Sequence, residues 1–216
     1  MDTILFDWDG TLIDTAQASF DAFQKSLRDV GIEIDFGLYE RIYSPDWRAM
    51  FRSVRLPPER WLETEDLWLR HYGQEIPEML PGARQTLMGF TSAGYNLGIV
   101  TSGSRSRVRR ELSSLGLAGA FQVVVCSEDV VNRKPHPEGL ETAMSRIRKL
   151  REFCCYVGDS PEDVEMSKRA GIRAIGILSQ YPNSKKILHS DPDLVLESIS
   201  DLLWHFDIPI APAARL

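Results

Sequence analysis

The chain has few cysteines and no long apolar run. Only three cysteines occur among its 216 residues, two of them adjacent, and this odd number favours buried reduced thiols over a disulfide framework. No apolar run reaches about 18 residues, so we expect no transmembrane helix and no membrane partner. The first ten residues contain Asp2, Asp7 and Asp9 and no basic residue. We therefore expect no signal peptide and a cytoplasmic location.

An excess of positive charge is also missing. The 25 basic residues are outnumbered by 31 acidic ones, and the net charge of −6 disfavours nucleic acid as a partner. The apolar share of 43% and the charged share of 26% are those of a globular protein, so a sizeable core can form. The length exceeds a usual domain of ~100–150 residues and suggests one domain with an insertion. The choice between monomer and homodimer stays open.

The hydrophobic pattern predicts an α/β fold. A short apolar strand over residues 3–6 is followed from about residue 15 by helical spacing. From residue 81 onward, strands at 97–100, 121–126, 153–157 and 174–178 alternate with helices at 83–91, 106–115, 137–150 and 161–170. This alternation indicates a mainly parallel sheet. We expect residues 1–14 and 81–216 to form the core, residues 15–80 an inserted helical cap, and the tail 208–216 to be irregular.

Polar residues follow four of the expected strands. They are Asp7 and Asp9, then Thr101, Ser102 and Gly103, then Lys134, and then Asp159 and Asp163. In a parallel sheet the carboxyl ends of the strands meet at one edge, where ligands bind. Carboxylates suit Mg²⁺, a turn that begins a helix suits phosphate, and a lysine adds a mobile positive charge. A carboxylate can also attack phosphorus and form an aspartyl-phosphate.

Each of these residues alone also has an ordinary structural interpretation. An Asp at a strand end often forms a turn, Thr101 or Ser102 could cap the next helix, and a lysine is usually solvated. Asp159 and Asp163 could serve the first turn of the helix expected from residue 161. Their joint placement at one sheet edge favours the functional interpretation.

Four ordered segments resemble the motifs of the haloacid dehalogenase-like hydrolase superfamily. They are Asp7-Trp8-Asp9-Gly10-Thr11-Leu12, Thr101, Lys134-Pro135, and Gly158-Asp159-Ser160 with Asp163. The insertion resembles the helical cap of the phosphoglycolate phosphatase and β-phosphoglucomutase branch. The resemblance implies a Rossmann-like parallel sheet core with an inserted α-helical cap that acts as a lid.

The same resemblance implies roles for individual residues. Asp7 would be the nucleophile, and Asp9 the acid that protonates the leaving oxygen and later activates water. Thr101 and Lys134 would hold the phosphoryl oxygens, together with Ser102, Gly103 and the backbone N–H of Trp8. The carboxylates of Asp7 and Asp159 and the main-chain carbonyl of Asp9 would bind Mg²⁺, with Asp163 supporting it directly or through water. The implied activity is Mg²⁺-dependent hydrolysis of a small phosphorylated metabolite.

Departures from related patterns narrow the reaction. The sequence keeps Asp9, and Lys25 is the single lysine of the expected cap, which disfavours the dehalogenase and phosphonatase chemistries of this superfamily. Ser19 stands where β-phosphoglucomutases carry a histidine, so hydrolysis is favoured over isomerisation. A phosphomutase and a non-catalytic binding domain remain as alternatives.

The substrate's leaving group is the least constrained part of the prediction. Residues 15–80 contain seven arginines, one of which could reach an acidic leaving group, and twelve acidic residues, which favour a solvated mixed-charge face. We expect Trp61 and Trp68 to pack inside the cap, Trp8 to fill space near the mouth of the site, and His136 to serve its loop.

Overall fold

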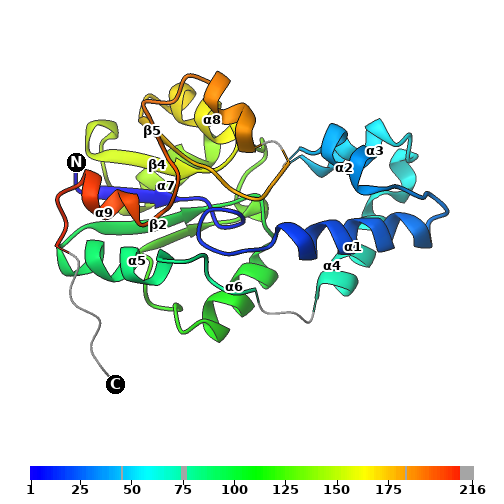
Figure 1. Cartoon of the computed structure of the whole chain (residues 1–216), viewed down its shortest axis with the longest axis horizontal. Helices are drawn as coiled ribbons and strands as arrows, with labels where there is room; N and C mark the ends of the chain where they lie inside the picture. Colours follow the sequence, from blue (N-terminus) through cyan, green and yellow to red (C-terminus); the bar gives the residue numbers. More distant parts are fainter. Residues whose placement is uncertain (45, 74–76, 183, 210–216) are drawn as a thin grey trace.

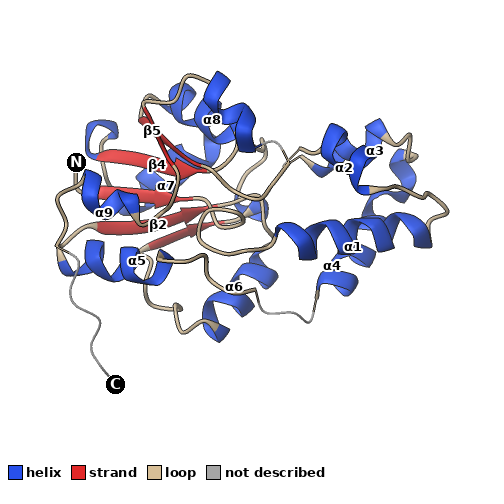
Figure 2. Cartoon of the chain, viewed as in Figure 1, coloured by secondary structure: helices blue, strands red, loops and turns tan. Residues whose placement is uncertain are grey.

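The computed structural model describes residues 1–44, 46–73, 77–182 and 184–209. Its centre is one parallel sheet of six strands in the order β3-β2-β1-β4-β5-β6 (Figure 2). The strands are β1 (Thr3–Phe6), β2 (Asn96–Val100), β3 (Val123–Val125), β4 (Cys154–Gly158), β5 (Arg173–Ile177) and β6 (Leu194–Leu196). The α/β prediction and its five strands are confirmed. The additional strand β6 was not predicted because it has only three residues, all half-buried, at the sheet edge.

The register brings the carboxyl ends of the central strands level. Phe6 at the end of β1 pairs with Ile99 of β2 on one side and Val157 of β4 on the other. The backbone N–H of Asp7 continues this pairing by donating to the carbonyl of Val157 at 2.8 Å. Residues that follow β1, β2 and β4 therefore start from one edge of the sheet, as the sequence predicted.

Helices cover both faces of the sheet (Figures 1 and 2). One face is covered by α5 (Ala83–Ser92), α6 (Arg105–Ser114) and α9 (Asp201–His205), and the other by α7 (Glu138–Ile147) and α8 (Pro161–Ala170). Ile4 and Phe6 of β1 pack in the first layer and Leu5 in the second, because successive strand residues point to opposite faces. Short 3₁₀ turns lie at Ser127–Asp129, Arg151–Phe153 and Ser184–His189.

The segment between β1 and β2 contains a separate group of helices. These are α1 (Ala16–Asp29), α2 (Phe36–Ile42), α3 (Trp47–Ser53) and α4 (Trp61–Tyr72), with a 3₁₀ turn at Pro58–Arg60. They lie beyond the carboxyl edge of the sheet, at the right in Figure 1. Phe23, Tyr39, Phe51 and Trp68 are buried in a cluster of their own there, apart from the two layers on the sheet. We call these helices the helical insertion.

Other expectations concern the cysteines, the membrane and the tail. The three cysteines are buried and free, which confirms the prediction of reduced thiols. None of the described helices has the length and apolar character needed to cross a bilayer. In the predicted irregular tail, Ile208 and Pro209 lie in no helix or strand, and residues 210–216 lie outside the described residues.

Candidate active site

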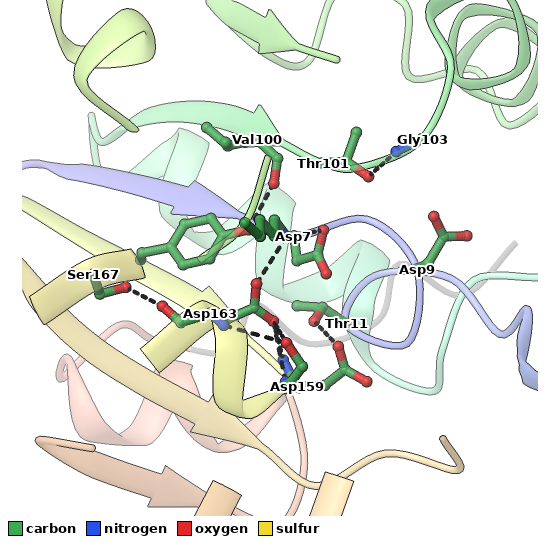
Figure 3. Close-up of polar contacts among 12 residues, drawn as sticks. Asp7, Asp9, Thr11, Val100, Thr101, Gly103, Asp159, Asp163 and Ser167 are labelled. Atoms are coloured by element: carbon green, nitrogen blue, oxygen red, sulfur yellow. Dashed lines mark hydrogen bonds and ion pairs between the residues drawn. The ribbon is translucent and has the colours of Figure 1, made fainter. Parts of the chain in front are cut away.

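Lys134 links two of the predicted carboxylates. Its Nζ lies 2.8 Å from Asp7 Oδ1 and 2.8 Å from Asp163 Oδ1, and it donates to the hydroxyl of Tyr156 at 2.8 Å. The lysine side chain is only 6% exposed, so it is not the solvated surface lysine of the ordinary interpretation. Tyr156 in β4 donates in turn to the carbonyl of Val100 at 2.6 Å (Figure 3). The sheet itself therefore fixes the lysine between the two carboxylates.

Asp163 and Ser160 form a reciprocal cap at the start of α8. Asp163 Oδ2 accepts from the backbone N–H groups of Asp159 and Ser160, each at 3.1 Å, and from Ser160 Oγ at 2.8 Å. The backbone N–H of Asp163 donates to Ser160 Oγ at 3.2 Å. This capping box satisfies N–H groups that the first helical turn leaves free. The predicted first-turn role of Asp163 is thus present together with its contact to Lys134.

Asp159 lies opposite Asp7 and Asp163 at the same edge. Ser179 Oγ donates to Asp159 Oδ2 at 2.5 Å, and Thr11 Oγ1 approaches Asp159 Oδ1 at 3.5 Å. One oxygen from each of the three aspartates lies within 4.8 Å of the others. Figure 3 shows these three side chains turned toward one another, with Asp9 apart from them.

The charge of this cluster fits a divalent cation. Three buried carboxylates face one positive side chain, Lys134. Burial raises the pKa of Asp7 to about 7 and the pKa of Asp159 well above its usual range, and the neighbouring carboxylates add to both shifts. The ionised cluster therefore lacks positive charge, and oxygen ligands of this kind suit Mg²⁺.

Asp9 has a different partner, which the sequence did not predict. Its carboxylate accepts two hydrogen bonds from Arg107, to Oδ1 at 2.8 Å and to Oδ2 at 2.5 Å. Arg107 also lies 3.3 Å from Glu111 Oε2, which accepts from the indole Nε1 of Trp8 at 2.7 Å. Burial raises the pKa of Asp9, but the guanidinium outweighs burial and holds it below its usual range.

The sequence analysis did not select Arg107, because its spacing from Glu111 is typical of an ion pair on the protein surface. Arg107 and Glu111, four residues apart on a basic helix, are typical of a solvated ion pair. In the structure Arg107, Val108, Glu111 and Leu112 form the buried stripe of α6. In the sequence, the apolar residues Val108 and Leu112, each next to one of these charged residues, are the signal that Arg107 and Glu111 lie on the side of α6 that faces the core.

Gly10 and Thr15 shape the loop that carries Asp9. Gly10 has φ +76°, a conformation that side chains rarely adopt, and a Cβ there would lie 2.4 Å from Asp159 Oδ2. Thr15 Oγ1 donates to Asp9 Oδ1 at 2.9 Å and contacts the hydroxyl of Tyr181 at 2.7 Å. That hydroxyl also lies 3.0 Å from Ser19 Oγ.

The turn after β2 reaches the same site. Thr101 Oγ1 accepts from the backbone N–H of Gly103 at 3.0 Å, so its hydroxyl also braces the turn. The N-cap position of α6 is Ser104, and neither Thr101 nor Ser102 caps this helix. Gly103 leaves room for the guanidinium, because a Cβ there would lie 2.4 Å from Arg107 Nη2.

A cavity of about 160 Å³ joins these residues to the helical insertion. The predicted residues that line it are Asp7, Asp9, Thr101, Ser102, Gly103, Lys134 and Asp159. Asp163 lies behind Lys134, in contact with it. Arg107 and Tyr181 of the core also line the cavity, although the sequence analysis did not select them.

Three tryptophans and one histidine near the site were given expected roles from the sequence. Trp8 does not lie near the mouth of the cavity, contrary to the expectation. Its side chain is fully buried in the layer on one face of the sheet, where its indole N–H donates to Glu111. Trp68 lies in the cluster of the helical insertion, as expected, and also lines the cavity, whereas Trp61 packs at the edge of that cluster. His136 is exposed in its loop, where its Nδ1 accepts from the backbone N–H of Glu138 at 3.3 Å.

The arginines of the helical insertion do not line the cavity. Six of the seven are exposed, and the half-buried Arg60 pairs with Glu63 at 3.0 Å. The mixed-charge face predicted from the composition is therefore the correct interpretation of these residues.

Comparison with known proteins identifies the family. Residues 4–177 match the family model of the haloacid dehalogenase-like hydrolases. The chain belongs to this hydrolase family. The fold agrees with that of a solved hydrolase from Pseudomonas syringae, with a TM-score of 0.86 at 24% identity over 96% of this chain and 98% of the other.

Two relatives carry the names of phosphatases. Phosphoglycolate phosphatase of Salmonella choleraesuis (strain SC-B67) is 30% identical over 95% of this chain and 92% of its own length. Pyrophosphatase PpaX of Halalkalibacterium halodurans is 31% identical over 94% of this chain and 95% of its own length. This member of the haloacid dehalogenase-like hydrolases is accordingly a phosphatase acting on phosphoric monoesters.

Proposed function

We propose that this chain is a Mg²⁺-dependent phosphatase, of the phosphoglycolate phosphatase type, that hydrolyses a small phosphorylated metabolite through an aspartyl-phosphate on Asp7. The observation that carries the proposal is the position of Asp7. Its carboxylate lies at the end of the central strand, 2.8 Å from Lys134 and within 4.8 Å of an oxygen of Asp159. The names of the relatives support a small phosphorylated substrate.

We further propose that residues 1–14 and 81–216 form the catalytic core and residues 15–80 its cap. The helical insertion has its own aromatic cluster and contributes one wall of the cavity. A cap in this position can admit the substrate by opening and exclude water by closing.

In the first step Asp7 attacks the phosphorus atom. A bond forms between a carboxylate oxygen and phosphorus, and the bond from phosphorus to the leaving oxygen breaks. While both Asp9 oxygens accept from Arg107 the carboxyl is ionised, so we propose that it turns from Arg107 toward the bound phosphoryl group, whose negative charge raises its pKa, and takes up a proton from solvent. Asp9 then donates that proton to the leaving oxygen, which departs as an alcohol. Lys134 and Thr101, with the backbone N–H groups of Ser102, Gly103 and Trp8, hold the phosphoryl oxygens and offset their charge.

In the second step water hydrolyses the aspartyl-phosphate. Asp9 is now a carboxylate, and it takes a proton from the water as the water attacks phosphorus. The bond between phosphorus and the Asp7 oxygen breaks, which restores the Asp7 carboxylate and releases inorganic phosphate. The Arg107 contact fixes the orientation of the Asp9 carboxylate between the two steps.

We propose Asp7, Asp159 and the main-chain carbonyl of Asp9 as the residues that hold Mg²⁺. When bound, the ion neutralises charge on the phosphoryl oxygens and on the carboxylates. Both oxygens of Asp163 are engaged, one by Lys134 and the other by the capping box. We therefore assign Asp163 to support the site through Lys134 and water rather than as a direct ligand.

Hydrolysis is favoured over the phosphomutase alternative. A mutase of this branch uses a cap histidine at the position of Ser19, by the resemblance noted above. Ser19 instead contacts the Tyr181 hydroxyl at 3.0 Å and lines the cavity. All four proposed catalytic side chains, those of Asp7, Asp9, Thr101 and Lys134, are present. Their presence disfavours a non-catalytic binding domain.

The test is release of inorganic phosphate from sugar phosphates, phosphoglycolate, nucleotides and pyrophosphate, compared as kcat/KM with and without Mg²⁺. We expect chelation of Mg²⁺ to abolish release and Asp7→Asn to lower kcat by about 1,000-fold or more. The same change at exposed Asp14 is the matched control and should leave kcat within about twofold. Isomerisation faster than phosphate release would favour the mutase, and activity that survives Asp7→Asn would overturn the mechanism.

A further inference from the structure

The part of the cavity wall made by residues other than the proposed phosphoryl-binding and metal-binding ones is rich in aromatic rings. They are Phe23, Tyr39, Tyr43, Trp47 and Trp68 of the helical insertion and Tyr181 of the core. Met50 and Leu69 also line it, together with the small polar residues Ser19 and Ser44. We call this part of the cavity the leaving-group chamber, because a phosphate held at Asp7 would place its organic group there.

Ring contacts make the chamber wall continuous between the two parts of the molecule. Trp47 and Trp68 lie 4.4 Å apart between ring centroids, and Tyr43 lies 5.1 Å from Tyr181 across the boundary of insertion and core. The planes of these two pairs are inclined by 72° and 34°. The rings of each pair are inclined rather than stacked in parallel, and the second pair joins the insertion to the core.

Positive charge is almost absent from the chamber. Among the described residues of the helical insertion, the one charged side chain on the cavity wall is acidic, Glu65. The cations of the wall come from the core: Lys134, Arg107 and Arg133. Lys134 is held by Asp7 and Asp163, and Arg107 by Asp9 and Glu111.

The environment of Arg107 further limits what it can offer a substrate. Its guanidinium lies 5.2 Å from the ring centroid of Tyr72 and 6.0 Å from that of Trp68. The guanidinium thus lies near two stacked rings while two carboxylates accept from its N–H groups. A carboxylate on the leaving group would have to displace Asp9 and would meet the negative charge of Glu65.

We propose that the leaving group of the natural substrate is uncharged and apolar, with an aromatic ring as the favoured form. This inference rests on the proposed phosphatase function, and it predicts that phosphoglycolate, whose leaving group carries a carboxylate, is a poor substrate of this enzyme. Burial of an apolar group in the chamber removes its surface from water, which favours binding. The volume of about 160 Å³ is that of the whole cavity, which must also hold the phosphoryl group, so it restricts the organic group to a small one.

The test compares benzyl phosphate with 4-carboxybenzyl phosphate and with phosphoglycolate, at saturating Mg²⁺. The benzyl pair differs by one carboxylate that lies away from the reacting bond. We expect kcat/KM for benzyl phosphate to exceed that for either carboxylated substrate at least tenfold. Equal values, or a preference for a carboxylated substrate, would overturn the proposal.

Two variants test which residues distinguish benzyl phosphate from the carboxylated substrates. Glu65→Lys places a cation in the chamber wall and should raise the ratio of kcat/KM for 4-carboxybenzyl phosphate to kcat/KM for benzyl phosphate at least fivefold, and an unchanged ratio would contradict the proposal. Arg133→Gln tests the remaining core cation. A loss confined to the carboxylated substrates would mean that Arg133 binds the leaving group, which contradicts the proposal, whereas an equal effect on all substrates supports it.

Binding without turnover separates this inference from the proposed function. Benzylphosphonate and 4-carboxybenzylphosphonate cannot be hydrolysed in the same way, and calorimetry in the presence of Mg²⁺ gives their Kd values. Tighter binding of benzylphosphonate by at least tenfold supports the chamber even if no substrate releases phosphate, a result that would count against the function alone. Equal or reversed affinities would reject the chamber.

Discussion

Individual charged residues at this site are held by buried partners. Arg107 is 6% exposed and Glu111 is fully buried, and Trp8 donates to the same Glu111 carboxylate. Burial raises the pKa of Glu111, and the guanidinium opposes that shift. Because a buried carboxylate without a partner is costly, Glu111 fixes Arg107, and Arg107 fixes Asp9. Arg107 is accordingly a positioning residue for the proposed acid and base.

The first prediction concerns the leaving group that Asp9 protonates. Arg107→Gln should lower kcat/KM, which reports the first step, by roughly 10- to 100-fold for benzyl phosphate, because general acid catalysis contributes about 10²–10⁴-fold and a misplaced acid loses part of it. We expect this loss of orientation to outweigh the higher pKa that Asp9 gains without the guanidinium. For 4-nitrophenyl phosphate, whose leaving group departs without a proton, the loss should be less than about threefold. Arg107→Lys should fall between, since lysine keeps the charge but not the paired hydrogen bonds.

Arg109→Gln is the control for this prediction, since Arg109 is exposed on the same helix. It should leave both substrates within twofold of the parent values. Equal losses of kcat/KM on both substrates in Arg107→Gln, with unchanged Tm, would mean that Arg107 does not act through Asp9 in the protonation of the leaving group.

At the scale of elements, the loop after β1 and the start of α8 are fitted to each other. Gly10 in the loop faces Asp159, which follows β4. The capping box of Ser160 and Asp163 fixes the first turn of α8 and with it the backbone of Asp159. Two segments about 150 residues apart in sequence thus depend on one close contact.

The second prediction tests this contact with a matched pair of substitutions. Gly10 and Gly31 both have positive φ, +76° and +84°, but a Cβ at Gly31 would meet nothing within 4 Å. Gly31→Ala should therefore cost about 1–2 kcal/mol of unfolding free energy from backbone strain alone and leave kcat unchanged. Gly10→Ala should cost more and lower kcat at least tenfold. Urea unfolding and phosphate release measure the two effects, and equal behaviour of the pair would contradict the account.

At the scale of the whole molecule, the sequence predicted the parts governed by periodicity. The strands and helices from residue 81 onward alternate clearly, and helix 161–170 agrees with α8 residue for residue. Asp7, Thr101, Lys134 and Asp159 were predictable because each follows a strand of a parallel sheet. The contact of Arg107 with Asp9 was not predictable, because it joins a helix and a loop that are 98 residues apart. The local stripe of Val108 and Leu112 indicates that Arg107 faces inward but not which residue it contacts.

The sequence predicted the helices of the insertion but not which of its side chains line the cavity. Spacing along residues 15–80 indicated helices, yet it does not reveal which rings face the cavity. Trp47 and Trp68 illustrate the difference: both pack in or against the aromatic cluster and both line the cavity. One side chain can serve both roles, so a choice between packing and binding is not decided by sequence.

The third prediction concerns the dependence of stability on pH in the absence of divalent cations. Burial raises the pKa of Asp7 to about 7 in the folded protein, against 3.8 for an ordinary Asp. Folding favours the protonated form of Asp7, because its pKa is higher in the folded protein than in the unfolded one. The resulting stability is fully present below about pH 4 and is lost as the pH rises through about 7. The Tm of the metal-free parent should therefore fall relative to that of Asp7→Asn between pH 5 and pH 8.

Mg²⁺ supplies the control for the third prediction. Added Mg²⁺ should raise the Tm of the parent at pH 8 by several degrees and that of Asp7→Asn by less, because ligand binding to the folded state stabilises it. Thermal unfolding at the two pH values, with and without Mg²⁺, gives all four comparisons. A difference between the two proteins that does not change with pH would mean that Asp7 titrates normally.

The central claim is that Asp7 becomes phosphorylated during turnover. Rapid acid quench during hydrolysis of benzyl phosphate, followed by mass spectrometry of the peptides, measures this directly. The account predicts one added phosphoryl group on the peptide that contains Asp7, removable by hydroxylamine and absent in Asp7→Asn. Turnover at the full rate with no phosphorylated Asp7, or the same label in Asp7→Asn, would contradict it.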